Sequence, residues 1–286
     1  MTQQKIKRQQ RNRHDKNKNE KIKIQLLLSL LLIGAVGVIF KLNHQMTNLR
    51  YTKQTVQTFE AETISPLETW HSQEVKFVYL TFDDGPTENT ETIMSLLKSY
   101  DIDATFFLTG TAMQTYSEAE TLLPKLLKEG HYLGIKGMSQ NYNDLYVEPS
   151  AAKTFTNSML DSQALLAKLT DGFVSNLCRA PYSTLQTFSQ AHVQALQANQ
   201  LKCWDWDIDT NDWSNHYDAK RILEKVKTEV ELLQHPNHLV ILLHEYDKTI
   251  EVLPQLIQYL KNEGYEFLPY HPSRHQVKNF YGSDEL

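Results

Sequence analysis

Short apolar segments alternate with longer amphipathic segments from Val75 to the end of the chain, and this alternation limits the possible folds most strongly. The apolar segments predict strands over 75–82, 104–108, 132–135, 201–208, 238–244 and 265–269, with another just before Arg179. The amphipathic segments predict helices near 90–100, 117–129, 150–169, 186–199, 218–233 and 250–262. This order is typical of an α/β fold with a mainly parallel sheet, and the number of strands favours a (β/α) barrel over an open sheet.

Polar and aromatic side chains gather where the predicted strands end. In a parallel barrel the reactive groups lie at the carboxyl ends of the strands, so residues that follow different strands meet at one face. The residues in such positions are Asp83, Asp84, Arg179, Tyr182, Asp209, Asp212, Trp213 and His244. We therefore expect one functional site at this end of the barrel.

The charge pattern of the N-terminal part predicts how the chain is oriented in a membrane. Residues 1–23 contain nine Lys and Arg against two acidic residues, a net charge of +7, and residues 24–40 contain no charge. An apolar run of this length is at the short limit for a membrane-spanning helix, and the basic segment before it is expected to stay in the cytoplasm. We predict an uncleaved signal anchor in the cell membrane, with a cleaved signal peptide as the alternative.

The residues after the predicted anchor fall into three parts. Residues 41–74 are polar and predict a stalk, residues 75–272 form the predicted extracellular domain, and residues 273–286 a C-terminal tail. Everything after residue 23 carries 20 Lys and Arg against 32 Asp and Glu, a net charge of −12. A nucleic-acid partner is excluded, because binding to phosphates requires a basic face.

The number and spacing of the cysteines and histidines limit which disulfides and metal sites this chain can form. Two cysteines, Cys178 and Cys203, rule out a disulfide-stapled scaffold and a four-cysteine zinc site, and we expect buried free thiols. They could form a disulfide only if their Cα atoms came within about 7 Å. His271 and His275 have the spacing of a metal-binding pair and follow the last strand, although Pro272 between them favours an ordinary surface segment.

Several motifs in order resemble the NodB-type polysaccharide deacetylases. They are Thr81-Phe82-Asp83-Asp84-Gly85-Pro86, Ala104-Thr105-Phe106-Phe107, Gly130-His131 through Gly134, Arg179-Ala180-Pro181-Tyr182, Asp209-Thr210-Asn211-Asp212-Trp213, Leu242-Leu243-His244 and Leu253-Pro254 through Phe267. The similarity covers roughly residues 75–270. It implies a distorted (β/α) barrel and metal-dependent removal of acetyl groups from N-acetylated sugars, commonly in peptidoglycan or related wall glycans.

The resemblance also implies residue roles. Asp83 would be the general base and Asp84 a metal ligand. Arg179 would orient Asp83, while His244 would be the general acid, tuned by Asp212. Tyr182 and Trp213 would form the walls of a sugar-binding groove. A metal would polarise the acetyl carbonyl and activate water, while the acid and base move the proton.

The sequence departs from the family pattern at the metal site. The two metal-binding histidines of the family fall on Lys136 and Gln140, and Ser183 stands where the family usually has glycine. A charged ammonium cannot coordinate a metal, and an amide oxygen is a poor zinc ligand. We expect Lys136 to supply a fixed positive charge that pairs with Asp84, and with Asp83 as a further partner.

Two hypotheses follow for function. The first is a metal-free homologue without metal-dependent activity, which binds cell-wall glycan or a partner in wall assembly through the inherited groove. The second is an active deacetylase that uses altered ligands for zinc or another divalent metal, or no metal. Lys136 and Gln140 favour the first hypothesis, whereas the intact set of Asp83, Arg179, Asp212 and His244 favours the second.

Overall fold

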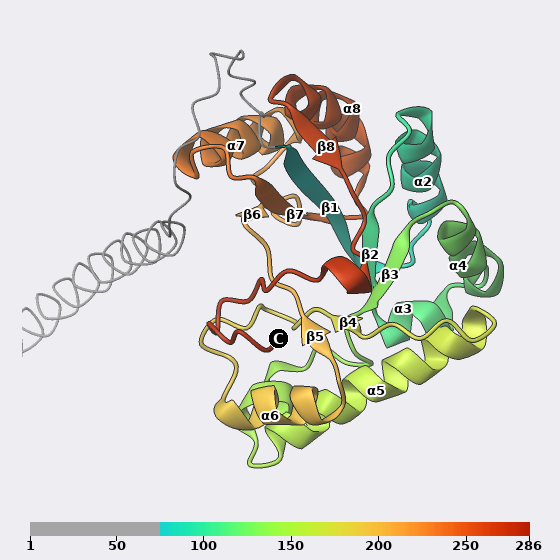
Figure 1. The fold of residues 1–286 in the computed structure, drawn as a ribbon. Helices are drawn as coiled ribbons and strands as arrows, with labels where there is room; N and C mark the ends of the chain where they lie inside the picture. Colours follow the sequence, from blue (N-terminus) through green and yellow to red (C-terminus); the bar gives the residue numbers. More distant parts are fainter. Residues whose placement is uncertain (1–74) are drawn as a thin grey trace, which may run out of the picture. The chain divides into compact units, whose positions relative to one another are not determined.

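Strands from all parts of residues 75–286 pair in one sheet, and every pairing in it is parallel (Figure 1). The computed structural model describes residues 75–286. The hydrogen-bonded order is β5-β4-β3-β2-β1-β7-β6, and β8 pairs with the start of β1. The strands are β1 Lys76–Gly85, β2 Thr105–Leu108, β3 Tyr132–Ile135, β4 Leu177–Cys178, β5 Lys202–Cys203, β6 Ile208–Asp209, β7 His238–His244 and β8 Tyr265–Phe267.

The sheet is a half-barrel rather than a fully paired barrel. Among residues 75–286, β5 and β6 end the hydrogen-bonded path and do not pair with each other. The single strand predicted over 201–208 is therefore wrong, because the chain crosses the open side between these two short strands. Trp204 N still donates to Cys178 O beside β4, whereas Asp207 N already donates to Val240 O on β7.

Helices cover the outer face of the sheet (Figure 1). They are α2 Thr90–Ser99, α3 Gly110–Thr115, α4 Ala119–Lys128, α5 Ala151–Leu169, α6 Gln190–Ala198, α7 Ala219–Leu232 and α8 Asp247–Asn262, with the single turns η1 Asn143–Val147 and η2 Pro272–Arg274. Five of the predicted helices match within a few residues, and α6 begins four residues later than expected. The sequence did not predict α3 or the π-helical turn η1, because both are too short to show a helical period.

The alternation of side chains along β1 builds two apolar layers. Leu80 and Phe82 point outward and join the large cluster formed with the helices. Tyr79, directly before Leu80, points inward and joins the smaller cluster that fills the half-barrel. That inner cluster consists of Tyr79, Phe107, Tyr132, Leu177, Trp204, Val240 and Tyr270.

The last residues are packed against the domain. Trp204 Nε1 donates to Gln276 O at 2.7 Å, and Asp205 N donates to Lys278 O at the same distance. The chain ends beside β5 and α6 (Figure 1), where Lys202 Nζ donates to Glu285 O and the Leu286 side chain is fully buried in the outer cluster. Residues 273–286, which we expected as a tail, thus complete the open side of the half-barrel.

The predicted basic tail 1–23, membrane anchor 24–40 and stalk 41–74 lie outside the described residues. Between residues 75 and 286, no helix has the length and apolar character needed to cross a membrane.

The buried C-terminal residue gives a stability prediction. We expect Leu286→Ala to lower the free energy of unfolding by about 2 kcal/mol, because it removes a fully buried side chain from the core. Leu232→Ala is the matched control, since this leucine at the end of α7 is 75% exposed. Urea denaturation of both variants measures the difference, and equal stability would show that the C-terminal segment is not part of the core.

Candidate functional site

The carboxyl ends of the strands line one cavity, as the sequence predicts. The register of β1 and β7 pairs Asp83 with His244, so these two side chains emerge next to each other. The cavity has a volume of about 410 Å³, within the range of roughly 300–1,000 Å³ typical of small-molecule sites. Its lining residues are Asp83, Asp84, Lys136, Gln140, Ala180, Tyr182, Trp206, Asp209, Trp213, Leu242 and His244.

Asp83 lies at the floor of the cavity between two cations. Its Oδ1 accepts a hydrogen bond from Arg179 Nη1 at 2.7 Å, and its Oδ2 lies 3.0 Å from Lys136 Nζ. Burial alone would raise the pKa of Asp83, but the positive charges of Arg179 and Lys136 outweigh burial and lower it. Asp83 is therefore held as a carboxylate.

Arg179 is fully buried behind Asp83 and binds to several strands at once. Its Nη1 also donates to Thr81 Oγ1 at 2.7 Å, its Nε donates to Trp204 O at 2.9 Å, and its guanidinium lies over the ring of Phe107. The planar guanidinium supplies the donors in a fixed geometry. Arg179 thus orients Asp83 and ties β1 to the residues after β5.

Asp84 lies at the cavity wall with Lys136 and Gln140. Its Oδ1 accepts hydrogen bonds from Lys136 Nζ at 2.7 Å and from Gln140 Nε2 at 2.6 Å. The backbone of Asp84 has φ = 69°, at a register shift that ends β1 and turns the side chain toward the cavity. The following residue, Gly85, leaves room for the buried side chain of Glu245, which a Cβ would approach to 2.3 Å.

This donor set does not fit a divalent metal. Burial alone would lower the pKa of Lys136, but the charges of Asp83 and Asp84 outweigh burial and raise it, so the ammonium stays protonated and has no lone pair. Gln140 offers an amide to Asp84 as a donor. Across residues 75–286, no group of three or more His, Cys, Asp or Glu side chains could hold a metal.

His244 and Asp212 form the second charged pair of the site. Asp212 Oδ1 lies 2.8 Å from His244 Nδ1, and its Oδ2 accepts hydrogen bonds from His244 N and from Thr249 Oγ1. Burial alone would lower the pKa of His244, but the hydrogen bond and charge of Asp212 outweigh burial and raise it. His244 Nε2 is directed to the cavity, 3.8 Å from Asp84 Oδ2. A carboxylate base and an imidazole thus face the same space.

Two exposed aromatic side chains stand at the cavity rim. Trp213 is 56% exposed and donates from Nε1 to Asp209 Oδ2 at 3.3 Å, while Tyr182 is 59% exposed and donates from its hydroxyl to Gln140 O at 2.9 Å. Ser183 has φ = 76°, the left-handed region that favours glycine.

Asp209, which the sequence placed at a strand end, lines the cavity, and so does Trp206, which the sequence did not assign to the site. Trp204 and Trp206 lie on one side of the segment between β5 and β6. Both pack on the inner cluster, whereas Asp205 and Asp207 contact the C-terminal segment. Asp209 breaks this alternation. The break between β5 and β6 brings both Trp206 and Asp209 to the cavity, which one regular strand over 201–208 does not predict.

Glu245 follows His244 in the sequence but is not one of the residues that line the cavity. It is buried beside His244 and accepts hydrogen bonds from Thr87 N at 3.0 Å and Thr87 Oγ1 at 2.7 Å. Burial raises the pKa of Glu245 to about 7.

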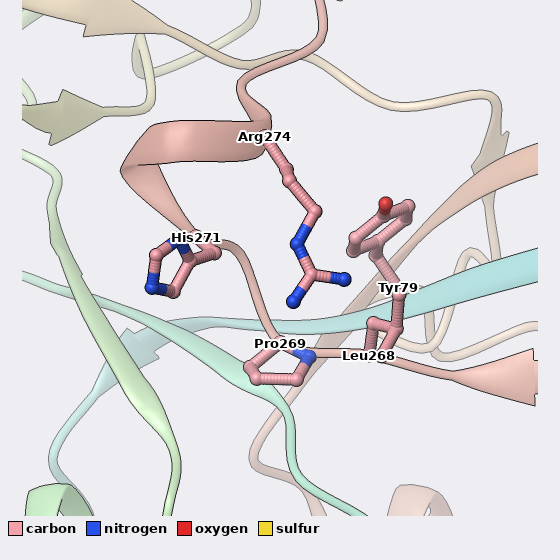
Figure 2. A pocket seen from close by; sticks show the side chains of 5 residues that line it. All are labelled: Tyr79, Leu268, Pro269, His271 and Arg274. Carbon is pink, nitrogen blue, oxygen red and sulfur yellow. The ribbon is translucent and has the colours of Figure 1, made fainter.

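The histidines near the C-terminus lie elsewhere. His271 lines a separate cavity of about 70 Å³ with Tyr79, Leu268, Pro269 and Arg274 (Figure 2). Figure 2 shows the Arg274 side chain reaching from η2 past the ring of Tyr79. His275 instead contacts the Tyr270 hydroxyl and Leu286 O. The pair therefore does not contribute to the candidate site.

Cys178 and Cys203 are register partners on β4 and β5, and both are buried free thiols. The hydrogen bond between the two thiols and burial raise the pKa of Cys203. The expectation of buried thiols is confirmed.

Lys136 gives a prediction that depends on pH. We expect Lys136→Met to lower the free energy of unfolding at pH 7 by about 3 kcal/mol, because it removes one partner from a buried ion pair. The pKa of Asp83 should then rise, and the penalty should shrink as the pH falls through this raised pKa, because a protonated Asp83 needs no cation. Urea denaturation between pH 7 and pH 3 measures the effect.

The control for this variant is Lys125→Met, since Lys125 pairs with Glu91 at the surface. Surface pairs contribute little, so we expect no measurable change there. A Lys136→Met variant that is as stable as the control at pH 7 would contradict the proposed ion-pair network.

Comparison with known proteins agrees with this geometry. The family described as Polysaccharide deacetylase matches residues 71–204. A peptidoglycan-N-acetylglucosamine deacetylase of Bacillus cereus is 31% identical over 223 residues, which cover 76% of this chain and 77% of that protein. YheN of Bacillus subtilis, provisionally named a polysaccharide deacetylase, is 34% identical over 209 residues, 71% of this chain and 70% of its own length.

Solved structures show the same fold. The crystal structure of a Bacillus cereus polysaccharide deacetylase superposes with a TM-score of 0.67 at 31% identity, covering 74% of this chain and all of the other. A CE4 esterase of Streptococcus mutans gives a TM-score of 0.60 at 28% identity, covering 68% of this chain and 85% of the other. The chain belongs to the NodB-type polysaccharide deacetylase family, also called CE4.

Proposed function

We propose that this protein is a membrane-anchored member of the family that binds N-acetylated cell-wall glycan without metal-dependent deacetylation. The observation that carries this proposal is the position of Lys136 Nζ, 2.7 Å from Asp84 Oδ1 and 3.0 Å from Asp83 Oδ2. A divalent ion at Asp84 would have to displace this ammonium. Lys136 and Gln140 stand where the resemblance puts the metal-binding histidines.

The substrate class rests on the cavity and the relatives. Trp213 and Tyr182 expose aromatic surface at the rim, and Asp209 and Gln140 add polar groups that can bind sugar hydroxyl or amide groups. The Bacillus cereus relative is named as acting on peptidoglycan N-acetylglucosamine. Both features support an N-acetylated wall glycan as the ligand.

The ammonium of Lys136 can balance the two carboxylates, but it cannot replace the chemistry of a metal. A bound metal ion lowers the pKa of its water and supplies a hydroxide near neutral pH. The lone pair of the Lys136 nitrogen is occupied by a proton, so this group cannot lower the pKa of a bound water as a metal does. Asp83 and His244 would then lack an activated nucleophile.

An active deacetylase with altered ligands or no metal remains the alternative. The observation that favours it is the complete pair of an ionised Asp83 and an Asp212-supported His244, both facing the cavity.

The double variant Lys136→His/Gln140→His separates the two functions. We expect the unmodified full-length protein to bind no stoichiometric zinc and to release no acetate from N-acetylglucosamine oligomers. The double variant should bind about one zinc per chain, because Asp84 and two imidazoles give three protein ligands, and it should gain deacetylase activity. Metal analysis after dialysis and acetate release measure both properties.

A triple variant that adds Asp84→Ala serves as the control and should lose the zinc again. Stoichiometric metal and acetate release by the unmodified protein would overturn the proposal in favour of the alternative.

We further propose a single-pass membrane position, with residues 24–40 as the anchor and residues 75–286 outside the cell. The support is the charge pattern, +7 over residues 1–23 followed by an uncharged apolar run. A protein tagged at its N-terminus should sediment with membranes and resist carbonate extraction. Added protease should cleave its C-terminal domain on intact cells.

A variant that lacks residues 1–40 should remain in the soluble fraction. Loss of the N-terminal tag from the mature protein would instead indicate a cleaved signal peptide.

A further inference from the structure

We propose that Tyr142 and Tyr182 form a second sugar-binding subsite beside the cavity, which takes an adjoining residue of an N-acetylated glycan chain. The inference rests on the proposed glycan-binding function and deepens it. We call the two side chains together the tyrosine ledge. Nothing in the sequence motifs pointed to Tyr142, which follows Gln140 by two residues.

The ledge is continuous with the cavity. Tyr182 lines the cavity, and its ring contacts the ring of Tyr142 edge to face, with centroids 5.4 Å apart and planes at 73°. The Tyr142 side chain is 43% exposed although it is large and apolar. The aromatic surface of the cavity therefore extends onto the segment that precedes η1.

The ledge is held rigidly. Tyr146, partly buried in η1, packs its ring 5.3 Å from that of Tyr142 and donates from its hydroxyl to Pro181 O at 2.7 Å. Tyr182 donates in the opposite direction, from its hydroxyl to Gln140 O. Two hydrogen bonds thus cross between the segments around 140–147 and 181–182. Side chains fixed in this way lose little conformational entropy when a ligand binds.

The chemistry of the ledge suits a sugar ring. Pyranose rings present an apolar face of C–H groups and a rim of hydroxyl groups, so an exposed aromatic ring can pack against the apolar face. A glycan chain longer than the cavity must leave it over the rim, and the tyrosine ledge forms part of that rim.

Binding of N-acetylglucosamine oligomers with one to six sugars, measured by isothermal titration calorimetry on the full-length protein, tests the ledge. We expect Tyr142→Ala to weaken hexamer binding about fivefold, the range of one aromatic contact, and to change dimer binding less than about twofold. Tyr142→Phe keeps the ring and should bind the hexamer as the unmodified protein does. Trp213→Ala should weaken the binding of every oligomer.

Tyr281→Ala is the matched control, because Tyr281 is 36% exposed in the C-terminal segment and does not line the cavity. Its hexamer binding should equal that of the unmodified protein. The proposed subsite is overturned if the unmodified protein binds the oligomers but Tyr142→Ala leaves hexamer binding unchanged. It is also overturned if Tyr142→Ala weakens dimer and hexamer binding equally. In either case the proposed glycan-binding function stands. If the unmodified protein binds no oligomer, both fail together.

Discussion

The site depends on one interaction, the pairing of two adjacent carboxylates with two buried cations. Asp83 and Asp84 leave the end of β1 together, and without partners their charges would repel each other inside the protein. Arg179 and Lys136 each take one side of Asp83, and Lys136 also reaches Asp84. The two negative charges of the carboxylates and the two positive charges of Arg179 and Lys136 cancel. The buried carboxyl ends of β1, β3 and β4 can therefore meet at one point.

This balance also supports the proposed choice of ligand. A divalent cation is attracted to a site with surplus negative charge, and here the surplus is already cancelled by the ammonium of Lys136. A neutral, N-acetylated sugar needs no such surplus. It requires apolar surface and hydrogen-bonding groups, which Trp213, Tyr182 and Asp209 provide at the rim. The charge pattern thus supports the proposal of a neutral glycan as the ligand.

The strand ends were predictable from the sequence because they depend on local patterns. The apolar run before Asp83 and the run before His244 each predict a strand, and parallel pairing places both side chains at one face. The approach of Tyr142 to Tyr182 was not predictable, since it depends on a π-helical turn and on two hydrogen bonds between distant segments. The packing of Leu286 likewise follows from the open side of the half-barrel, which no local pattern shows.

The set of Asp83, Arg179, Asp212 and His244 is the strongest argument for catalysis, yet Arg179 and Asp212 also have structural roles. Arg179 joins β1 to the residues after β5 through Thr81 and Trp204. Asp212 accepts from the backbone of His244 and from the Thr249 hydroxyl in α8, and its removal would leave those buried donors without partners. Arg179 and Asp212 would therefore stabilise the fold even in a chain without metal-dependent activity. The presence of Arg179 and Asp212 is therefore compatible with either function, whereas Lys136 at Asp84 is compatible with metal-dependent catalysis only if it moves away.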